Sequence, residues 1–520
     1  MKLKNILLCA SVLGGMTLAS CTGNFLDEDR NPNKLGPSTF WKTEADILKG
    51  LTACYAGLQP SASWGKPYER YIVIDNYRSD ELKHRNDVTE WTQLAQYQNE
   101  STNYVANDEW FNLYRSINFC NQCLDNIPNV PDDGSQNIID AKKTSIAEAR
   151  FLRAFFYYRL FINFGEKVPM PLHQLQGVES EFYPDQAQVG EVKALIETEL
   201  SECQRDLPES WSADMAGRAT KYAAAALLGK YYMFIGETAK AKAEFWKVID
   251  SHKYDLIANY GDNFDGRHEN NKESILEVQF SGKQAGDQYE YNLFALHLLP
   301  SVYKGSYEEA YPSEWLYNTL KQDLTVDGKY SDRLYNTIIF NDPQSRPFYY
   351  EEGKSFDDYH AQYDKDENRM SDPIYWYKFT NVNADLDDYW NESGTNVPLI
   401  RYADVLLLYA ECLNDEGLTK DAIGYINQVR NRVHVTPLPE TMTKDQVLKH
   451  LQDVERPCEL ALEGSRWYDL LRWGILKKTL VDHGKPFAEN LDETKHIKLA
   501  IPHAEFLMNP GWEQNEGYGK

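Results

Sequence analysis

Near the end of the chain, carboxylates and an arginine recur at short spacing around a tryptophan. The residues concerned are Glu459, Glu463, Arg466, Trp467 and Asp469. Two carboxylates that flank a glycosidic bond can hydrolyse it by acid-base catalysis, so this segment offers the residue types of a glycosidase. The alternative is a buried lattice of ion pairs, in which such acids hold Arg401, Arg430 and Arg466 and so pin helices together. Because the chain has 79 acidic residues, chance pairs of carboxylates are common, and we favour the lattice.

Other signatures of catalysis or metal binding are missing from the sequence. It contains no His-Glu-x-x-His, no Gly-x-Ser-x-Gly, no Walker A loop and no Gly-x-Gly-x-x-Gly. The 11 histidines show no ligand spacing, and no loop motif indicates calcium. We therefore expect a protein without enzymatic activity, transition-metal site or cofactor, and the many acids leave calcium binding open.

The cysteines do not form a recognisable framework. Of the eight, Cys9 and Cys21 belong to an N-terminal leader, which leaves six. A chain of 520 residues can bury a sizeable core and does not need disulfides to fold. Cys120 and Cys123 are the only close pair, and no second pair or histidine completes a redox or metal site. We interpret the six as buried, inert thiols.

Aromatic and polar residues interleave in two regions, 68–104 and 281–395. In the second, helical periodicity weakens and Asp, Asn, Gly and Pro are scattered, which predicts an irregular, loop-rich segment. Sugar rings stack on tyrosine and tryptophan faces, and their hydroxyls pair with Arg, Asp and Asn. Extended peptides suit the same chemistry, and any single residue can instead serve packing. Our ligand-binding candidates are Arg78, Asp80, Trp91, Tyr97, Tyr289, Tyr291 and Tyr303.

The first 20 residues have the form of an export signal. Lys2 and Lys4 precede a mostly apolar run, Ile6 to Leu18, which is short of the ~20 residues that span a bilayer as a helix. The run ends in Leu-Ala-Ser-Cys, the form of a lipobox, which predicts cleavage before Cys21 and acylation of its thiol. Acyl chains would then anchor the mature chain stably, with residues 21–38 as a polar tether.

The formal charge of −25 limits the partners of this chain. Nucleic-acid binding needs a basic footprint, and anionic lipid attracts basic segments, so we expect neither kind of direct contact. The same charge suits neutral ligands better than acidic ones. Beyond the leader, no segment is apolar enough to cross a membrane.

Helical patterns dominate the body of the chain. Apolar residues recur at helical spacing over 147–162, and Gly165 ends that helix. Segments 219–250 and 400–433 repeat one pattern of paired helices when Gly236 is aligned with Gly417. We predict a mostly α fold of tetratricopeptide-like helix pairs with few short strands. It forms one domain over 39–520, with helical repeats around 140–250 and 400–480.

Several motifs appear in a fixed order along this body: Glu148–Ala154, Ala219–Ala224, Lys272–Val278, Pro398–Glu411, Glu463–Leu470, and Ile501–Pro502 with Asn509–Gly511. This ordered set, with a lipobox in front, resembles the SusD-like (RagB/SusD) family. Tyr222 is a small departure, since members usually carry a small residue there. The resemblance implies a surface lipoprotein of the outer membrane. Such a protein sits as a lid over a SusC-like TonB-dependent transporter and lacks enzymatic activity.

Four functions remain open from the sequence. The resemblance implies capture of oligosaccharide or polysaccharide in the SusD branch, which we favour, or of peptide in the RagB branch. The acidic pairs leave a glycosidase as a third hypothesis, which a hydrolysis assay on mixed polysaccharides would detect. A purely structural tetratricopeptide protein is the fourth, and it predicts no small-ligand binding.

Overall fold

The computed structural model describes residues 40–60, 66–132, 134–175, 183–282, 290–300, 305–342, 344–345, 374–380 and 392–520. Cys21, Tyr289 and Tyr303 lie outside these ranges, as do the predicted leader and tether. The lipidation of Cys21 and the ligand-binding roles of the two tyrosines therefore stay predictions.

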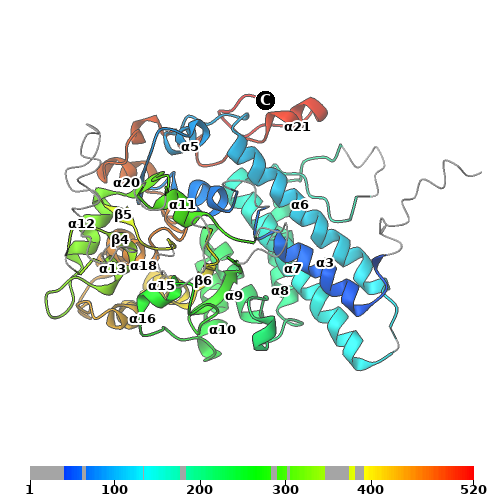
Figure 1. Cartoon of the computed structure of the whole chain (residues 1–520), viewed down its shortest axis with the longest axis horizontal. Coiled ribbons are helices and arrows are strands. Elements are labelled where there is room, and N and C mark those ends of the chain that lie inside the picture. The colour runs from blue at the N-terminus through cyan, green and yellow to red at the C-terminus, as the bar shows by residue number, and fades with distance from the viewer. Residues whose placement is uncertain are drawn as a thin grey trace, which may run out of the picture.

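Three helices run side by side through the N-terminal half: α3 (Glu44–Ala56), α6 (Tyr104–Asn126) and α7 (Gln136–Phe164) (Figure 1). Helix α7 has 29 residues and extends further toward the N-terminus than the predicted 147–162. It ends as predicted at Gly165, whose φ of 83° suits a residue without a side chain. Helix α8 (Glu191–Cys203) packs on α7.

Two helix pairs continue the scaffold: α9 (Lys221–Phe234) with α10 (Thr238–Asp250), and α15 (Tyr402–Asp415) with α16 (Thr419–Arg432). Gly236 and Gly417 lie in the two turns with φ of 81° and 83°, which confirms the predicted repeat. The pairs are far apart in sequence, yet α10 packs directly against α15. There the Trp246 and Tyr409 rings stack with centroids 5.8 Å apart.

The repeat works because small residues let paired helices approach closely. A Cβ atom at Gly229 of α9 would lie only 2.5 Å from the Phe245 ring of α10. Phe245 and its equivalent Ile426 are fully buried, as are Ala241 and Ala422. The side chain of one helix thus fills the space that the small residue of the other leaves open.

Strands are few and short in the described part of the chain. β1 (Leu82–His84) pairs with β3 (Ala310–Pro312), β2 (Ser274–Val278) with β6 (Val397–Arg401), and β4 (Ile338–Ile339) with β5 (Tyr375–Trp376), all antiparallel. Strand β2 matches the predicted motif. The motif beginning at Pro398 does not start as a helix, because its first residues pair with β2 and α15 begins only at Tyr402.

Short helices complete the fold. Within the predicted irregular segment they are α11 (Phe294–Leu298), α12 (Glu314–Gln322) and α13 (Asp332–Thr337), so the described parts of this segment have more regular structure than expected. Elsewhere they are α4 (Lys66–Tyr68), η1 (Glu69–Ile74), α5 (Thr89–Ala95), α17 (Lys444–His450), η6 (Leu451–Glu455), α18 (Arg456–Leu460), α19 (Arg466–Arg472), α20 (Leu476–Asp482) and α21 (His503–Met508). The predicted mostly α class with few strands is confirmed.

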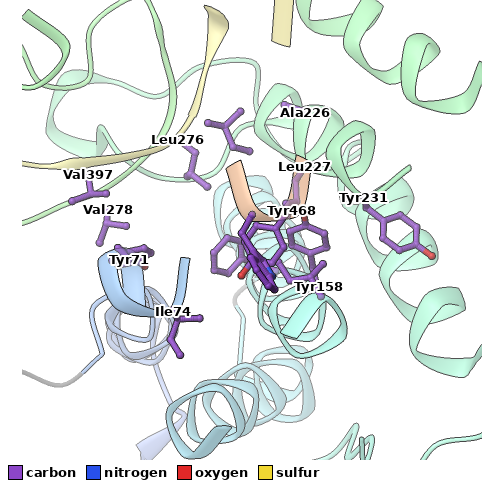
Figure 2. Close-up of a cluster of buried hydrophobic side chains, with 14 of the residues drawn as sticks. Tyr71, Ile74, Tyr158, Ala226, Leu227, Tyr231, Leu276, Val278, Val397 and Tyr468 are labelled. Carbon is purple, nitrogen blue, oxygen red and sulfur yellow. The ribbon is translucent and has the colours of Figure 1, made fainter. Parts of the chain in front are cut away.

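One buried cluster joins elements from the whole chain (Figure 2). Tyr71 and Ile74 of η1 face Tyr158 of α7, Leu227 of α9 and Tyr468 of α19. All five are at most 9% exposed. Burial of such side chains stabilises a fold by about 1.5–3 kcal/mol each, so this cluster holds the N-terminal and C-terminal helices together.

None of the helices in the described ranges is both long and apolar enough to cross a membrane.

Candidate functional site

The carboxylates near the C-terminus form a buried ion-pair lattice. Glu459 is fully buried, and one carboxylate oxygen lies 3.1 Å from Arg401 and the other 2.8 Å from Arg333. Glu455 pairs with Arg333 at 2.6 Å and with Arg430 at 2.5 Å. The predicted lattice is confirmed for Arg401 and, through Glu455, for Arg430, and it includes Arg333, which sequence reasoning missed. Arg466 instead pairs with Asp80, and Asp469 pairs with Arg456 and Arg472.

The charges around Glu459 decide its protonation. Burial by itself would raise the pKa of this carboxyl, but the guanidinium groups of Arg432, Arg333 and Arg401 outweigh burial and lower the pKa to about 2. A general acid needs a proton to donate near neutral pH and must reach its substrate. Glu459 carries no proton near neutral pH and is buried away from any substrate, so its role in the lattice is structural.

Two predicted binding residues of the first region, Arg78 and Asp80, lie inside the protein and are each 1% exposed. The Arg78 guanidinium lies 4.5 Å from the Trp467 ring centre and donates a hydrogen bond to Asn163 Oδ1 at 3.0 Å. Asp80 accepts two hydrogen bonds of 2.8 Å from Arg466. Both charges are therefore engaged by protein partners.

The aromatic members of that region are buried as well. Trp91 is 4% exposed and donates a hydrogen bond from Nε1 to Glu69 Oε1 at 3.2 Å, while its ring packs 5.1 Å from that of Tyr68. Tyr97 is 3% exposed, and its hydroxyl donates to the carbonyl of Arg78 at 2.7 Å. Arg78, Asp80, Trp91 and Tyr97 offer no free face to a ligand in this conformation. Their placement corrects our expectation of a binding surface here, because aromatic-polar composition fits a hydrogen-bonded core equally well.

Tyr291, from the second region, is placed differently. It is partly exposed and lines a groove of about 590 Å³ between α3, α6 and the chain around residue 290. The walls include Thr52, Ala53 and Ala56 of α3, Asn112, Arg115 and Phe119 of α6, and Phe280, Glu290 and Tyr291. A smaller hollow of about 200 Å³ adjoins it and shares Thr52, Ala56, Gln59, Phe280 and Glu290.

The local fold explains why the groove is open. Apart from Lys49, the α3 wall consists of small side chains, which leave room above the helix. At the end of α3, Gly57 lies so close to α6 that a Cβ atom there would be 2.4 Å from Ser116 Oγ. The two helices thus meet at the base of the groove, and the larger side chains of α6 form its opposite side.

The groove combines apolar faces with polar groups. Phe119 is partly exposed, and the Arg115 guanidinium lies 5.5 Å from its ring centre. Arg115 is exposed and has no ion-pair partner among the described residues. An aromatic face beside an exposed guanidinium can stack on a sugar ring and bond its hydroxyls. Sequence reasoning found Tyr291 but missed Arg115 and Phe119, because a regular amphipathic helix carries them.

Two other features of the molecule could be taken for sites. A cavity of about 110 Å³ lies within the core of Figure 2, beside Tyr71, Tyr158 and Tyr468, and has room for a few water molecules only. The ligand atoms of Asp262, Asp265 and His268 lie within 4.8 Å of one another. His268 Nδ1 lies 2.9 Å from Asp265 Oδ2, so a hydrogen bond explains their proximity, and we assign no metal.

Comparisons with known proteins agree with this architecture. Residues 272–518 match the family model described as the SusD family, and residues 24–233 match the one described as starch-binding associating with outer membrane. A SusD-like protein of Formosa agariphila is 26% identical over 540 residues and covers 98% of each chain.

Solved structures agree in fold over nearly the whole chain. A SusD superfamily protein from Bacteroides vulgatus superposes with a TM-score of 0.80 at 26% identity, covering 92% of this chain and 100% of the other. A laminarin binding SusD-like protein gives a TM-score of 0.72 at 26% identity with the same coverage. By family models, relatives and fold together, this chain belongs to the SusD-like (RagB/SusD) family.

Proposed function

We propose that this chain is a surface lipoprotein of the outer membrane that binds oligosaccharide or polysaccharide and delivers it to a TonB-dependent transporter. The observation that carries the binding role is the groove between α3 and α6, where Tyr291, Phe119 and Arg115 combine aromatic faces with a cation that no described carboxylate pairs. The family's starch-binding description and the laminarin-binding structure support a glycan as the ligand.

The size of the groove supports capture of a chain-like ligand. Its volume of about 590 Å³ falls in the ~300–1,000 Å³ range of small-molecule sites, and the adjoining hollow lengthens it. Two of its walls come from packed helices, so those side chains need little ordering when a ligand binds, and this lowers the entropic cost of binding. We propose that this protein, moving like a hinged lid, closes over the transporter and so hands it the bound ligand.

Affinity electrophoresis tests the binding role. The chain is run through gels that contain neutral or acidic polysaccharides, and we expect one polymer to retard it. Tyr291→Ala and Phe119→Ala should each weaken the interaction roughly tenfold, equivalent to about 1.4 kcal/mol. Phe111→Ala is the matched control, because Phe111 lies on the same helix, is 64% exposed and does not line the groove.

The outcomes separate the ligand classes. Retardation that both groove variants lose establishes glycan capture at this site. If no polymer retards the chain but peptides bind it, and Tyr291→Ala weakens that peptide binding, the peptide alternative replaces the glycan. Retardation that neither variant changes would place the glycan elsewhere on the molecule.

Membrane attachment is tested through the predicted lipid site. Cys21→Ser in the full chain should abolish incorporation of labelled fatty acid and release the protein from the membrane fraction. The partner is checked by co-purification. After mild detergent extraction, we expect a transporter of the TonB-dependent class to co-purify with the wild-type protein. A Cys21→Ser chain that still carries fatty acid would contradict the proposed anchor.

A further inference from the structure

Three cysteines lie close together in the interface between α3 and α6. Cys54 of α3 is fully buried, as is Cys120 of α6, and Cys123 is 1% exposed. The Sγ atoms of Cys54 and Cys123 are 3.4 Å apart, in van der Waals contact. Cys120 lies one helical turn from Cys123 and also interacts with Cys54. The other three described cysteines are buried elsewhere.

We propose that Cys54 and Cys123 become a disulfide when this chain folds in an oxidising compartment. A disulfide needs its sulfurs about 2.05 Å apart, which small side-chain rotations can provide from the observed contact. The two helices already pack against each other in the folded protein, which keeps the two sulfurs in contact. A metal is a poorer occupant, because these thiols do not form a mutually close ligand set within the described residues.

The chemistry is a thiol–disulfide exchange. The Cys54 and Cys123 thiols lose two protons and two electrons and form one S–S bond. The electrons and protons go to a disulfide oxidant, such as oxidised glutathione or an exported thiol oxidase, which becomes two thiols. The oxidising compartment rests on the proposed function, since it follows from export to the outer membrane.

Burial sets the time at which the bond forms. Desolvation, with help from the neighbouring thiols, raises the pKa of Cys54 well above its ordinary value. The reactive thiolate is therefore suppressed once the helices are packed, and exchange has to occur while α3 and α6 come together. The folded, reduced protein should resist oxidation for the same reason.

The bond would act on the candidate glycan site. Ala53 and Ala56, on either side of Cys54, line the groove, and so do Ser116 and Phe119 just before Cys120. A link between α3 and α6 fixes the separation of these two walls. It also closes a loop between residues 69 apart in sequence, which restricts the unfolded chain and stabilises the fold.

Refolding decides the proposal. The full chain is reduced, unfolded, and refolded in a glutathione redox buffer, then alkylated under denaturing conditions and digested. Mass spectrometry should show a peptide pair linked through Cys54 and Cys123, with Cys412 alkylated. Alkylation of both Cys54 and Cys123, or a link from Cys54 to Cys120, would overturn the proposal.

Variants test the structural consequence. Cys123→Ser should lower the thermal midpoint of the oxidised protein by several degrees, and reductant should remove the difference from wild type. Cys203→Ser, at another buried cysteine, is the control: it keeps Cys54 and Cys123, so its difference in midpoint from wild type should be the same with and without reductant. If Cys123→Ser shows the same change with and without reductant, the loss is one of packing and the bond is absent.

A sample isolated from cells separates this proposal from the proposed function. The full chain is produced with its own leader and alkylated at lysis. If the bond forms on refolding but the thiols are reduced in the sample from cells, export to an oxidising compartment is contradicted. The pairing of Cys54 with Cys123 is then still supported by the refolded protein. Glycan retardation of the same sample reports the groove independently.

Discussion

Asp80 and Arg466 lie 386 residues apart in sequence and form a two-pronged ion pair inside the protein. Arg466 Nε and Nη2 each donate a hydrogen bond of 2.8 Å to Asp80, and neither residue is more than 2% exposed. His483 adds a third contact to Asp80 at 2.6 Å, and its ring stacks on Trp315 with centroids 3.9 Å apart. This pair fastens the segment after η1 to the C-terminal helices, so a charge expected at a binding surface holds the fold together.

Replacing Asp80 should therefore destabilise the protein and leave ligand affinity intact. Asp80→Asn keeps the shape of the side chain but leaves the Arg466 guanidinium buried without a counter-charge, which costs about 3–5 kcal/mol. Denaturant unfolding measures the loss. Asp482→Asn removes a partner from an exposed pair with Lys478 and is the control, with little change expected. Equal stability of Asp80→Asn and wild type would contradict the role assigned to the pair.

Glu81, beside this pair, should give stability a dependence on pH. Its carboxyl is 1% exposed, its Oε2 accepts a hydrogen bond from the Leu462 amide at 3.2 Å, and its Oε1 has no partner among the described residues. Burial raises its pKa from 4.5 to about 8, only partly offset by the Arg466 charge. The folded chain thus keeps a proton that the unfolded chain releases.

The sign follows from that difference in bound protons. Between pH 4.5 and about 8 the folded state binds more protons at Glu81, so its contribution to stability is present below pH 4.5 and lost as pH rises to about 8. Glu81→Gln mimics the protonated form and should lack this contribution to the slope, which is about 1.4 kcal/mol per pH unit. Unfolding free energies of both proteins from pH 5 to 8 give the comparison. Parallel curves would show that Glu81 does not titrate in this range.

Gly229 should be essential to the packing of its helix pair. In Gly229→Ala the new Cβ would meet the Phe245 ring at 2.5 Å, and overpacking of this kind costs about 1–3 kcal/mol. Gly424→Ala, within α16, is the matched control because no atom lies within 4 Å of its Cβ position. There alanine should stabilise the helix by about 0.5–1 kcal/mol. In thermal denaturation, the midpoint should fall for Gly229→Ala and rise for Gly424→Ala, relative to wild type.

Trp91 and Tyr291 should separate stability from binding. Trp91→Ala removes a buried indole and should cost about 3–5 kcal/mol of stability, yet the folded fraction should bind glycan as wild type does. Tyr291→Ala should weaken binding with little effect on the unfolding midpoint, because this side chain is only partly buried. Weaker binding per folded molecule in Trp91→Ala would restore a direct role for that residue.

Periodicity in the sequence determined much of the helical scaffold by itself. The glycines at 236 and 417 and the buried faces of α10 and α16 follow from local rules, since a helix turn and an apolar stripe involve only near neighbours. The arginine lattice was also predictable in kind, because buried guanidinium groups need carboxylates. Its full membership was not, since Arg333 reaches Glu455 across 122 residues of sequence.

Which aromatic residues face a ligand was decided only by the tertiary structure. Trp91 and Tyr291 occur in similar aromatic-polar stretches, yet one is buried against Tyr68 and the other lines an open groove. Composition is the same in both cases, because a hydrogen-bonded core and a sugar platform use the same side chains. Exposure depends on which distant helices pack over a residue, and that information lies in long-range contacts rather than in local sequence.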